Sequence, residues 1–234
     1  MNKTNTHLFM MNERQKPSVV VIIPAYNEAP RVGSVVKTAI DSGIADRVIV
    51  VDDGSTDKTA EAAAKAGAEV LRKNKNEGKG AAIQYGIKSV KADIYILLDA
   101  DLYGLKPTHL HRLLETLVND PKNGMVLGRL KGGRMATNIS HFITPNITGQ
   151  RAIRRELALK LPDLKPFGFA VELFLNDFCQ KNGYQLVYVD LEGLSQYLKE
   201  EKIGFLKGFL FRLKMYRDMI RYLYLKLTGK ISFQ

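Results

Sequence analysis

The chain has 234 residues, 45% of them hydrophobic and 25% charged, and a formal net charge of +11 at pH 7. This composition is that of a globular protein with a substantial core, and it excludes a collagen-like, low-complexity or repeat protein. The single cysteine, Cys179, excludes an internal disulfide. The excess of Lys and Arg favours an acidic partner such as phosphate, nucleic acid or anionic lipid, although a basic surface alone would also account for it.

The length fits one domain with two appendages. Residues 1–16 are polar and aperiodic, without an apolar run long enough for a signal peptide, and we expect a flexible tail on a cytoplasmic protein. Residues 17–200 are predicted to form the folded domain. Residues 201–234 are predicted to form a basic amphipathic helix.

Strands and helices alternate along the first half of the chain. The β-branched run 19–23 predicts a strand buried on both faces, and residues 31–42 follow with helical spacing. Strands are further predicted at 48–51, 69–71, 95–98 and 125–127, and helices at 56–65, 81–90 and 171–178. Repeated strand-helix-strand units favour an α/β fold with a mostly parallel central sheet and helices on both faces.

Polar clusters follow three of these predicted strands. They are PAYNE (24–28), DDGSTD (52–57) and DAD (99–101). Each cluster alone is explained by turn and capping chemistry. Together they predict a ligand site, because ligands of parallel sheets bind at the carboxyl ends of the strands. Two carboxylates at the end of an apolar strand repel each other, so we expect a cation beside Asp99 and Asp101.

The order and spacing of four motifs, PAYNE, VVDDGSTDKT, NEGKGAAIQYG and LLDAD, resemble glycosyltransferase family 2 with its GT-A nucleotide-sugar-binding fold. The resemblance is strong over residues 19–129 and continues more weakly through TGQRA (148–152) and FGFAVE (167–172). The second half looks most like the branch that contains dolichol-phosphate mannosyltransferases and other polyprenyl-phosphate sugar transferases.

The resemblance implies a role for each residue of the donor site. DAD matches the family's DXD motif, in which Asp101 would bind Mg²⁺ or Mn²⁺, and Asp99 would bind the ribose or base or reach the metal through water. Gln196 stands where several relatives place a metal-binding histidine, so we expect it to complete the metal site as a weaker ligand. Asp52 would bind the base or ribose, and Lys79 the base or phosphates. The remaining residues expected to line the nucleotide are Pro24, Ala25, Tyr26, Glu28 and Ala100.

The same resemblance assigns the acceptor side. Arg129, in a glycine-rich basic segment, and Arg151, in TGQRA, would bind donor and acceptor phosphates, for which arginine is well suited. Arg154 and Arg155 are expected to be solvated residues at the start of a helix. Glu172 would be the acceptor-side carboxylate, acting as general base if the acceptor is a hydroxyl. Its alternative role is to complement the dipole of its own helix.

The C-terminal segment 203–229 carries an apolar stripe with basic residues mostly on the other side. It is too rich in charge to span a bilayer. Such a helix can lie on an anionic membrane, or pack its stripe on the domain or on a second subunit. The stripe consists of Phe205, Leu206, Phe209, Leu213, Tyr216, Ile220, Leu223, Tyr224 and Leu227.

These patterns lead to one preferred function and two alternatives. The preferred one is a metal-dependent, inverting transfer of a hexose from a UDP- or GDP-linked sugar to a polyprenyl phosphate or another phosphorylated or hydroxyl acceptor. The alternatives are a retaining transferase of the glucosyl-3-phosphoglycerate synthase kind and a non-catalytic, membrane-associated subunit that binds nucleotide sugars. No nucleic-acid partner is expected; a homodimer and a peripheral location at the inner face of the membrane remain open.

Overall fold

The computed structural model describes residues 16–131, 148–196 and 205–231, without the side chains of 205–214. Its centre is a seven-stranded sheet with the order β3-β2-β1-β4-β7-β6-β8. A two-stranded ribbon of β5 (Leu102–Tyr103) and β9 (Ser195–Gln196) stands beside it. The strands of the main sheet are β1 (Val19–Ala25), β2 (Arg47–Asp52), β3 (Glu69–Arg72), β4 (Ile94–Leu97), β6 (Asn123–Lys131), β7 (Arg151–Arg154) and β8 (Gln185–Glu192).

All strands of the main sheet except β7 run in the same direction. β7 lies antiparallel between β4 and β6, with Leu97 opposite Arg151. The start of β7 therefore lies at the edge of the sheet where β4 ends. The fold is the mostly parallel α/β arrangement that the sequence predicts.

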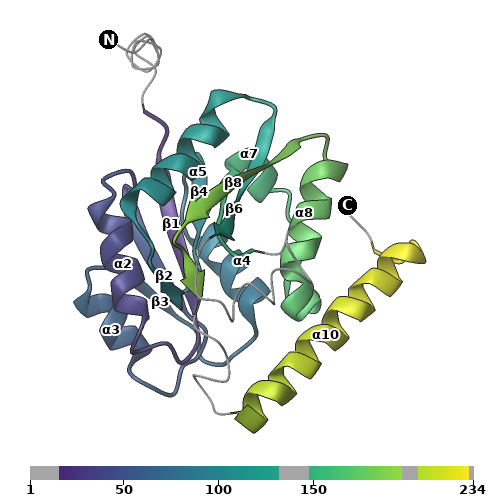
Figure 1. Cartoon of the computed structure of the whole chain (residues 1–234), viewed down its shortest axis with the longest axis horizontal. Helices are drawn as coiled ribbons and strands as arrows, with labels where there is room; N and C mark the ends of the chain where they lie inside the picture. The colour runs from purple at the N-terminus through teal and green to yellow at the C-terminus, as the bar shows by residue number, and fades with distance from the viewer. Residues whose placement is uncertain (1–15, 132–147, 197–204, 232–234) are drawn as a thin grey trace.

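Helices cover both faces of the sheet (Figure 1). Alternate residues of β1 divide between the two cores: Val21 packs with α2 and α5, whereas Ile22 packs with α4 and α8. This two-sided burial explains the continuous β-branched run of the strand. The helices are α2 (Val32–Asp41), α3 (Thr59–Lys65), α4 (Lys79–Ser89), α5 (Pro107–Asn119), α7 (Arg155–Ala158), α8 (Val171–Lys181) and α10 (Phe205–Leu227), with a 3₁₀ turn η1 (Lys165–Ala170).

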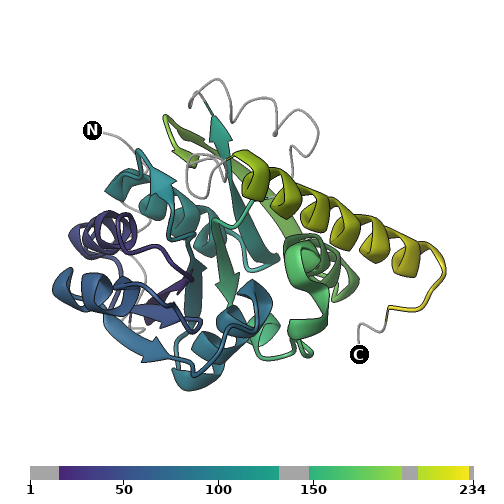
Figure 2. The ribbon, with the colours of Figure 1, turned by 90° about the horizontal axis from the view of Figure 1, so that it is seen from below.

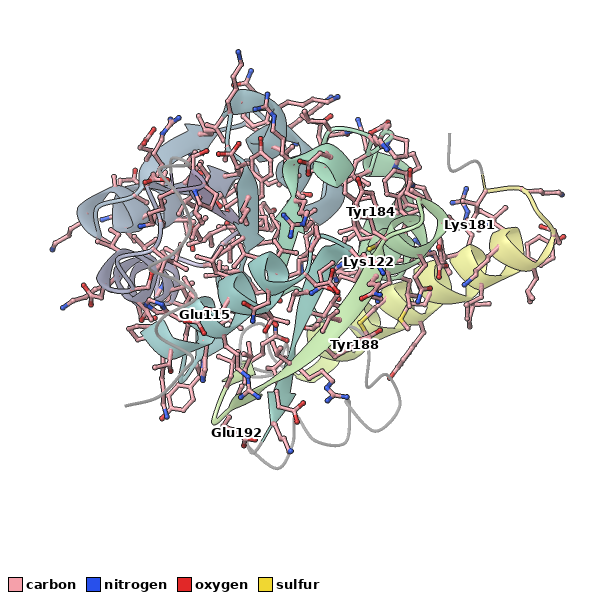
Figure 3. All side chains as sticks on the ribbon, turned by 90° about the horizontal axis from the view of Figure 1, so that it is seen from above. Glu115, Lys122, Lys181, Tyr184, Tyr188 and Glu192 are labelled. Carbon is pink, nitrogen blue, oxygen red and sulfur yellow. The ribbon has the colours of Figure 1, made fainter. Side chains whose placement is uncertain are left out.

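Two features of the second half differ from the sequence prediction. Helix α5 and strand β8 were not predicted. Strand β8 forms an outer edge of the sheet. Figure 3 labels two residues of this strand, Tyr188 and Glu192. Arg154 is not a solvated helix residue but the last residue of β7. Its guanidinium donates to the backbone oxygens of Asn123, Leu117 and Asp120, which ties β7 to the end of α5.

Helix α10 lies along α8 and η1 at one side of the domain (Figures 1 and 2). Tyr222 is its anchor: the side chain is 2% exposed, its ring meets Phe167 edge-on at 6.1 Å, and its hydroxyl donates to Asp177 Oδ2 at 2.6 Å. The predicted apolar stripe does not make this contact. Among the residues with described side chains, stripe members Ile220 and Leu227 are 67% and 87% exposed, so the idea that the stripe packs on its own domain is wrong there.

None of the helices within the described ranges is long and apolar enough to cross a membrane.

Candidate functional site

The three polar clusters that follow β1, β2 and β4 lie at one edge of the sheet. β1 is paired in parallel with β2, which places Ala25 beside Asp52, and with β4, which places Ile22 beside Leu97. Leu98 then donates its backbone N–H to the oxygen of Ile22. Asp52 and the DAD segment therefore leave the sheet at neighbouring points, as expected from the rule for parallel strands.

Hydrogen bonds join the PAYNE loop to the loop after β2. Asn27 has a left-handed backbone (φ 55°), and this turn directs its N–H to Ser55 Oγ at 2.9 Å. Its side-chain oxygen accepts from the N–H of Thr56 at 2.9 Å. Glu28 N–H donates to Thr59 Oγ1 at 2.8 Å. Neither α2 nor α3 has a side-chain hydrogen bond at its N-cap, so the polar side chains of these motifs hold two strand-end loops together and do not cap the helices.

A second set of bonds joins the loop after β2 to the start of α4. The carboxylate of Asp53 is 2% exposed and accepts from the N–H groups of Glu77 and Gly78 and from Lys73 Nζ at 2.8 Å. Gly78 has φ 94°, a conformation that glycine adopts without strain, and it directly precedes Lys79. Asp53 thereby fixes the turn from which Lys79 projects.

Lys79 connects the donor and acceptor sides of the predicted site. Its ammonium contacts Asp99 Oδ1 and lies 2.5 Å from Glu172 Oε1. Both carboxylates are largely buried, with side-chain exposures of 12% and 14%. Burial disfavours the charged ammonium, but the attraction of Asp99 and then Glu172 outweighs it and raises the pKa of Lys79 above its ordinary value. Lys79 therefore stays charged and is the cation that compensates Asp99 in this structure.

Two glutamine amides complete the surroundings of Asp99. Gln150 Nε2 donates to Asp99 Oδ2 at 2.9 Å, and Gln196 Nε2 donates to the same oxygen. Gln150 is fully buried and also accepts a hydrogen bond from Thr148 Oγ1. A side chain at Gly149 would collide with the Asp99 carboxylate, so this glycine allows the close approach of the loop. Gln196 thus reaches the predicted metal site, but its amide nitrogen faces Asp99.

Within the described residues, only one carboxylate oxygen of Asp52 accepts a hydrogen bond. Oδ1 accepts from the N–H of Ser55 at 2.9 Å. Oδ2 is buried and has no hydrogen-bond partner among the described residues, although Arg72 Nε lies 3.3 Å from it in an ion pair. A buried acceptor without a hydrogen bond costs about 1–3 kcal/mol. An N–H or O–H of a ligand could remove this cost.

The predicted arginines lie in different surroundings. Arg151 is 1% exposed and donates to the backbone oxygen of Thr148 and, at 3.2 Å, to Asn176 Oδ1. Burial lowers the pKa of Arg151, while Glu172 and Asp99 attract its charge from nearby. Arg129 projects from β6 and pairs with Asp190 of β8 at 2.7 Å. Arg151 is therefore a buried residue near Asp99 and Glu172, whereas Arg129 is held by an ion pair to the neighbouring strand β8.

The other predicted nucleotide-lining residues occupy the PAYNE loop and the DAD segment. Tyr26 is 44% exposed, and Glu28 is buried next to Arg31, with 3.3 Å between the charged groups. Ala100 is buried between Asp99 and Asp101, which are each 9% exposed. Pro24 and Ala25 are the last residues of β1. All of them lie at the same sheet edge as Asp52.

Five loops are thus linked at one polar edge of the sheet, which also holds a buried carboxylate acceptor, Asp52, and a lysine, Lys79, paired with two carboxylates. A family model described as "Glycosyl transferase family 2" matches residues 20–176, two thirds of the chain, and includes every motif of that edge. The chain belongs to glycosyl transferase family 2. It is therefore a transferase enzyme with a GT-A fold, and the family assignment made from its motifs is confirmed.

Three relatives illustrate the range of the family. An uncharacterized protein of Methanocaldococcus jannaschii is 30% identical over 92% of this chain and 97% of the relative. A glucosyl-3-phosphoglycerate synthase of Mycolicibacterium smegmatis is 27% identical over 69% of this chain and 64% of the relative. A dolichol-phosphate mannosyltransferase of Pyrococcus furiosus is 29% identical over 65% and 50%. The chain thus spans nearly all of the first relative but less than two thirds of the other two.

Solved structures support the same fold. A glucosyl-3-phosphoglycerate synthase from Mycobacterium tuberculosis, crystallised with Mn²⁺, UDP and glucosyl-3-phosphoglycerate, aligns with a TM-score of 0.71 and 25% identity, covering 91% of this chain and 80% of that one. A mannosyl-3-phosphoglycerate synthase from Rubrobacter xylanophilus aligns with a TM-score of 0.72 and 24% identity, covering 92% and 76%, which is a likeness of fold.

Sequence reasoning missed three residues of the site. Arg72 ends β3, opposite Asp52 in the parallel register, so the strand-end rule that pointed to Asp52 applies to it as well. Asp53 is the residue after Asp52, and the sequence pattern did not indicate a separate role for it. Gln150 reaches Asp99 because β7 is antiparallel, and its start therefore lies where β4 ends. The sequence pattern did not indicate that reversal.

Proposed function

We propose that this glycosyltransferase moves a hexose from a UDP- or GDP-linked donor to a phosphorylated acceptor, with polyprenyl phosphate as the preferred acceptor and inversion at the sugar. The observation that carries the proposal is the meeting, at one sheet edge, of two groups: the buried Asp52 oxygen that accepts no hydrogen bond from the described residues, and the cluster of Asp99, Lys79 and Glu172. Asp52 suits the binding of a nucleoside, and the cluster of Asp99, Lys79 and Glu172 suits the binding of a diphosphate and an acceptor.

The donor side divides the roles among three residues. Asp52 Oδ2 accepts an N–H of the base or an O–H of the ribose, which satisfies its buried lone pair. Lys79 is a charged ammonium close to DAD and offers its remaining donor to the diphosphate. Asp99 anchors Lys79. Pro24, Ala25, Tyr26, Glu28 and Ala100 line the nucleotide.

The residues fit a divalent metal of the Mg²⁺ or Mn²⁺ kind. The available ligands are carboxylate and amide oxygens, which such hard ions prefer. No group of three His, Cys, Asp or Glu side chains suited to a metal occurs in the described ranges, and Mg²⁺ is commonly held by one or two carboxylates together with substrate phosphates. Asp101 would be the principal ligand, with Asp99 and Gln196 beside it. When bound, the metal supplies Lewis acidity that stabilises the charge on the departing diphosphate.

The acceptor side depends on Glu172 and the arginines. A phosphate acceptor is already ionised, so it needs cations more than it needs a base. Arg151 holds the loop around Thr148 and Gln150 in place, and the exposed Arg129 can exchange its partner Asp190 for a phosphate. Glu172 positions Lys79 in this case. With a hydroxyl acceptor, Glu172 would instead take the proton of the attacking group.

A retaining transfer to a small phosphorylated hydroxyl acid is the second candidate. It is favoured by the similarity to the glucosyl-3-phosphoglycerate synthases of Mycolicibacterium smegmatis and Mycobacterium tuberculosis. The anomeric configuration of the product separates it from the inverting reaction.

The test is a donor and acceptor screen. UDP-, GDP- and dTDP-sugars are supplied with Mg²⁺ or Mn²⁺, and release of nucleoside diphosphate is measured with a short-chain polyprenyl phosphate in detergent, with 3-phosphoglycerate, or with neither. Release that requires the polyprenyl phosphate supports the first proposal, and release that requires 3-phosphoglycerate supports the second. Glu172→Gln then distinguishes a base from a positioning residue, since loss of a base costs about 10²–10⁴-fold in turnover.

A further inference from the structure

The outward face of α10 is an apolar and basic surface that nothing in the described structure covers. Its apolar members project at positions i, i+4, i+7, i+8 and i+11 of the helix, which places them on one side. They are 36%, 67%, 46%, 59% and 87% exposed, in the order Tyr216, Ile220, Leu223, Tyr224 and Leu227. We refer to these five residues as the outer stripe. A contiguous stripe of this size is unusual for a surface that faces only water.

Basic residues border the outer stripe. Arg217 and Arg221 join Tyr216, Ile220 and Tyr224 in lining a shallow groove on the helix. Residues 215–231 contain four Lys or Arg and a single acid, Asp218. That acid is turned inward onto η1, where its Oδ2 would lie 2.7 Å from a side chain added at Gly168. Asp218 also pairs with Arg217 at 2.9 Å, so the net positive charge beside the outer stripe comes from Arg221.

The opposite face of α10 is already occupied by the domain. Tyr222 is buried against Phe167, and Lys226 pairs with Asp177 at 2.7 Å. These contacts fix the orientation of α10, so that the outer stripe faces away from the domain. No residue that the structure describes covers it.

We propose that the outer stripe and its arginines bind an anionic lipid surface, with α10 lying in the plane of the interface. Apolar side chains enter the acyl region, Arg221 contacts lipid phosphates, and the two tyrosines suit the boundary between them. A second copy of the chain fits less well, because two copies of the same basic face would place like charges opposite each other. The proposal does not depend on which acceptor the enzyme uses.

Contacts on the inner face of α10 connect this helix to the acceptor side of the site. Phe167, which Tyr222 contacts, belongs to η1 and stacks on Phe174 of α8 at 3.9 Å. η1 leads directly into α8, whose second residue is Glu172. The element that meets the lipid therefore supports the turn that positions Glu172 near Lys79.

Vesicle flotation of the full chain tests the proposal without donor or acceptor. Vesicles are made of phosphatidylcholine alone or with phosphatidylglycerol added. The variants are the double substitution Ile220→Ser with Leu227→Ser, the charge reversal Arg221→Glu, and Leu159→Ser as the control. Leu159 is a 58% exposed leucine at the end of α7, away from the outer stripe.

The wild type and the Leu159→Ser control should float with anionic vesicles and stay behind with neutral ones, and added salt should weaken the binding. The double substitution and Arg221→Glu should each reduce binding by about tenfold or more, with melting temperatures unchanged because these side chains are exposed. Absence of binding to anionic vesicles, or equal binding by all variants, would overturn the proposal. Loss of a dimer in the double variant, without vesicle binding by the wild type, would identify a second copy as the occupant. A failed donor screen alone would leave the flotation result unaffected.

Discussion

Replacing Lys79 by methionine tests whether the lysine is the internal cation of the site. The substitution keeps the length of the side chain and removes its charge. Asp99 and Glu172, which are mostly buried, would then lose the ammonium that pairs with both of them. A hydrogen bond to a charged group contributes about 1.5–3 kcal/mol, and removing one partner of a buried ion pair costs about 3–5 kcal/mol. Because the lysine side chain is 28% exposed, solvent screening reduces this cost, and we expect a loss of about 3 kcal/mol.

The measurement is urea unfolding followed by circular dichroism, with Lys88→Met as the control. Lys88 is an exposed residue of the same helix, so its substitution should change the unfolding free energy by less than about 0.5 kcal/mol. A loss of about 3 kcal/mol corresponds to a melting temperature lower by roughly 6–12 °C in a chain of this size. Equal stability of the Lys79 and Lys88 variants would refute the assignment of Lys79 as a buried counter-ion.

The pH dependence adds a second criterion. The pKa of Lys79 in the folded state lies above its ordinary value of 10.5. A raised lysine pKa means that its contribution is complete below pH 10.5 and declines as pH rises from there toward the folded pKa. The stability difference between wild type and Lys79→Met should therefore be constant from pH 7 to 9 and should shrink in strongly alkaline solution. A difference that grew above pH 10.5 would contradict this sign.

Three further outcomes are expected. Asp101→Ala should abolish the turnover that depends on Mg²⁺ or Mn²⁺, as measured by nucleoside diphosphate release, and a retained rate would exclude Asp101 as metal ligand. Asp52→Asn should weaken UDP or GDP binding about tenfold or more in calorimetry with little loss of stability, whereas Asp53→Asn should lower the melting temperature. Burial raises the pKa of Cys179 to about 12, so iodoacetamide at pH 8 should modify it only after unfolding; rapid labelling of the native protein would contradict its burial.

The first half of the fold could be predicted because its signals are local and strong. The β-branched runs of β1 and β2 specify strands that are buried on both faces, and polar residues stop each run at the sheet edge. Parallel order follows from the helices between them. The convergence of Asp52 with the DAD segment was therefore predictable and is confirmed by the strand register.

The second half depends on contacts that are distant in sequence. β7 is only four residues long and lies antiparallel between β4 and β6, so its direction is fixed by tertiary pairing. Buried and exposed residues alternate only weakly along β8, because half-buried residues such as Tyr188 follow one another in this strand. His109 of α5 is 6% exposed, and its Nε2 is 3.2 Å from the backbone oxygen of Glu192, the last residue of β8. Only the position of β8 explains that burial.

Helix α10 shows how a correct pattern can lead to a wrong contact. The helical wheel identified the larger apolar stripe, and hydrophobic burial alone would favour packing that stripe on the domain. The structure instead uses Tyr222, which lies outside that stripe, because its hydroxyl donates to Asp177 and its ring packs on Phe167. An aromatic residue with a polar end can dock at the rim of a core where both kinds of partner are present.

The neighbouring acids Asp52 and Asp53 indicate how structural and functional carboxylates can be separated in this site. Both are buried, and the sequence does not distinguish them. Asp53 is fully engaged by Lys73 and two backbone N–H groups, and its removal should therefore affect the fold of the loop. Asp52 keeps one buried oxygen without a hydrogen bond among the described residues. Its only other contact there is the ion pair with the exposed Arg72 at 3.3 Å, so Asp52 is the carboxylate that we assign to the ligand.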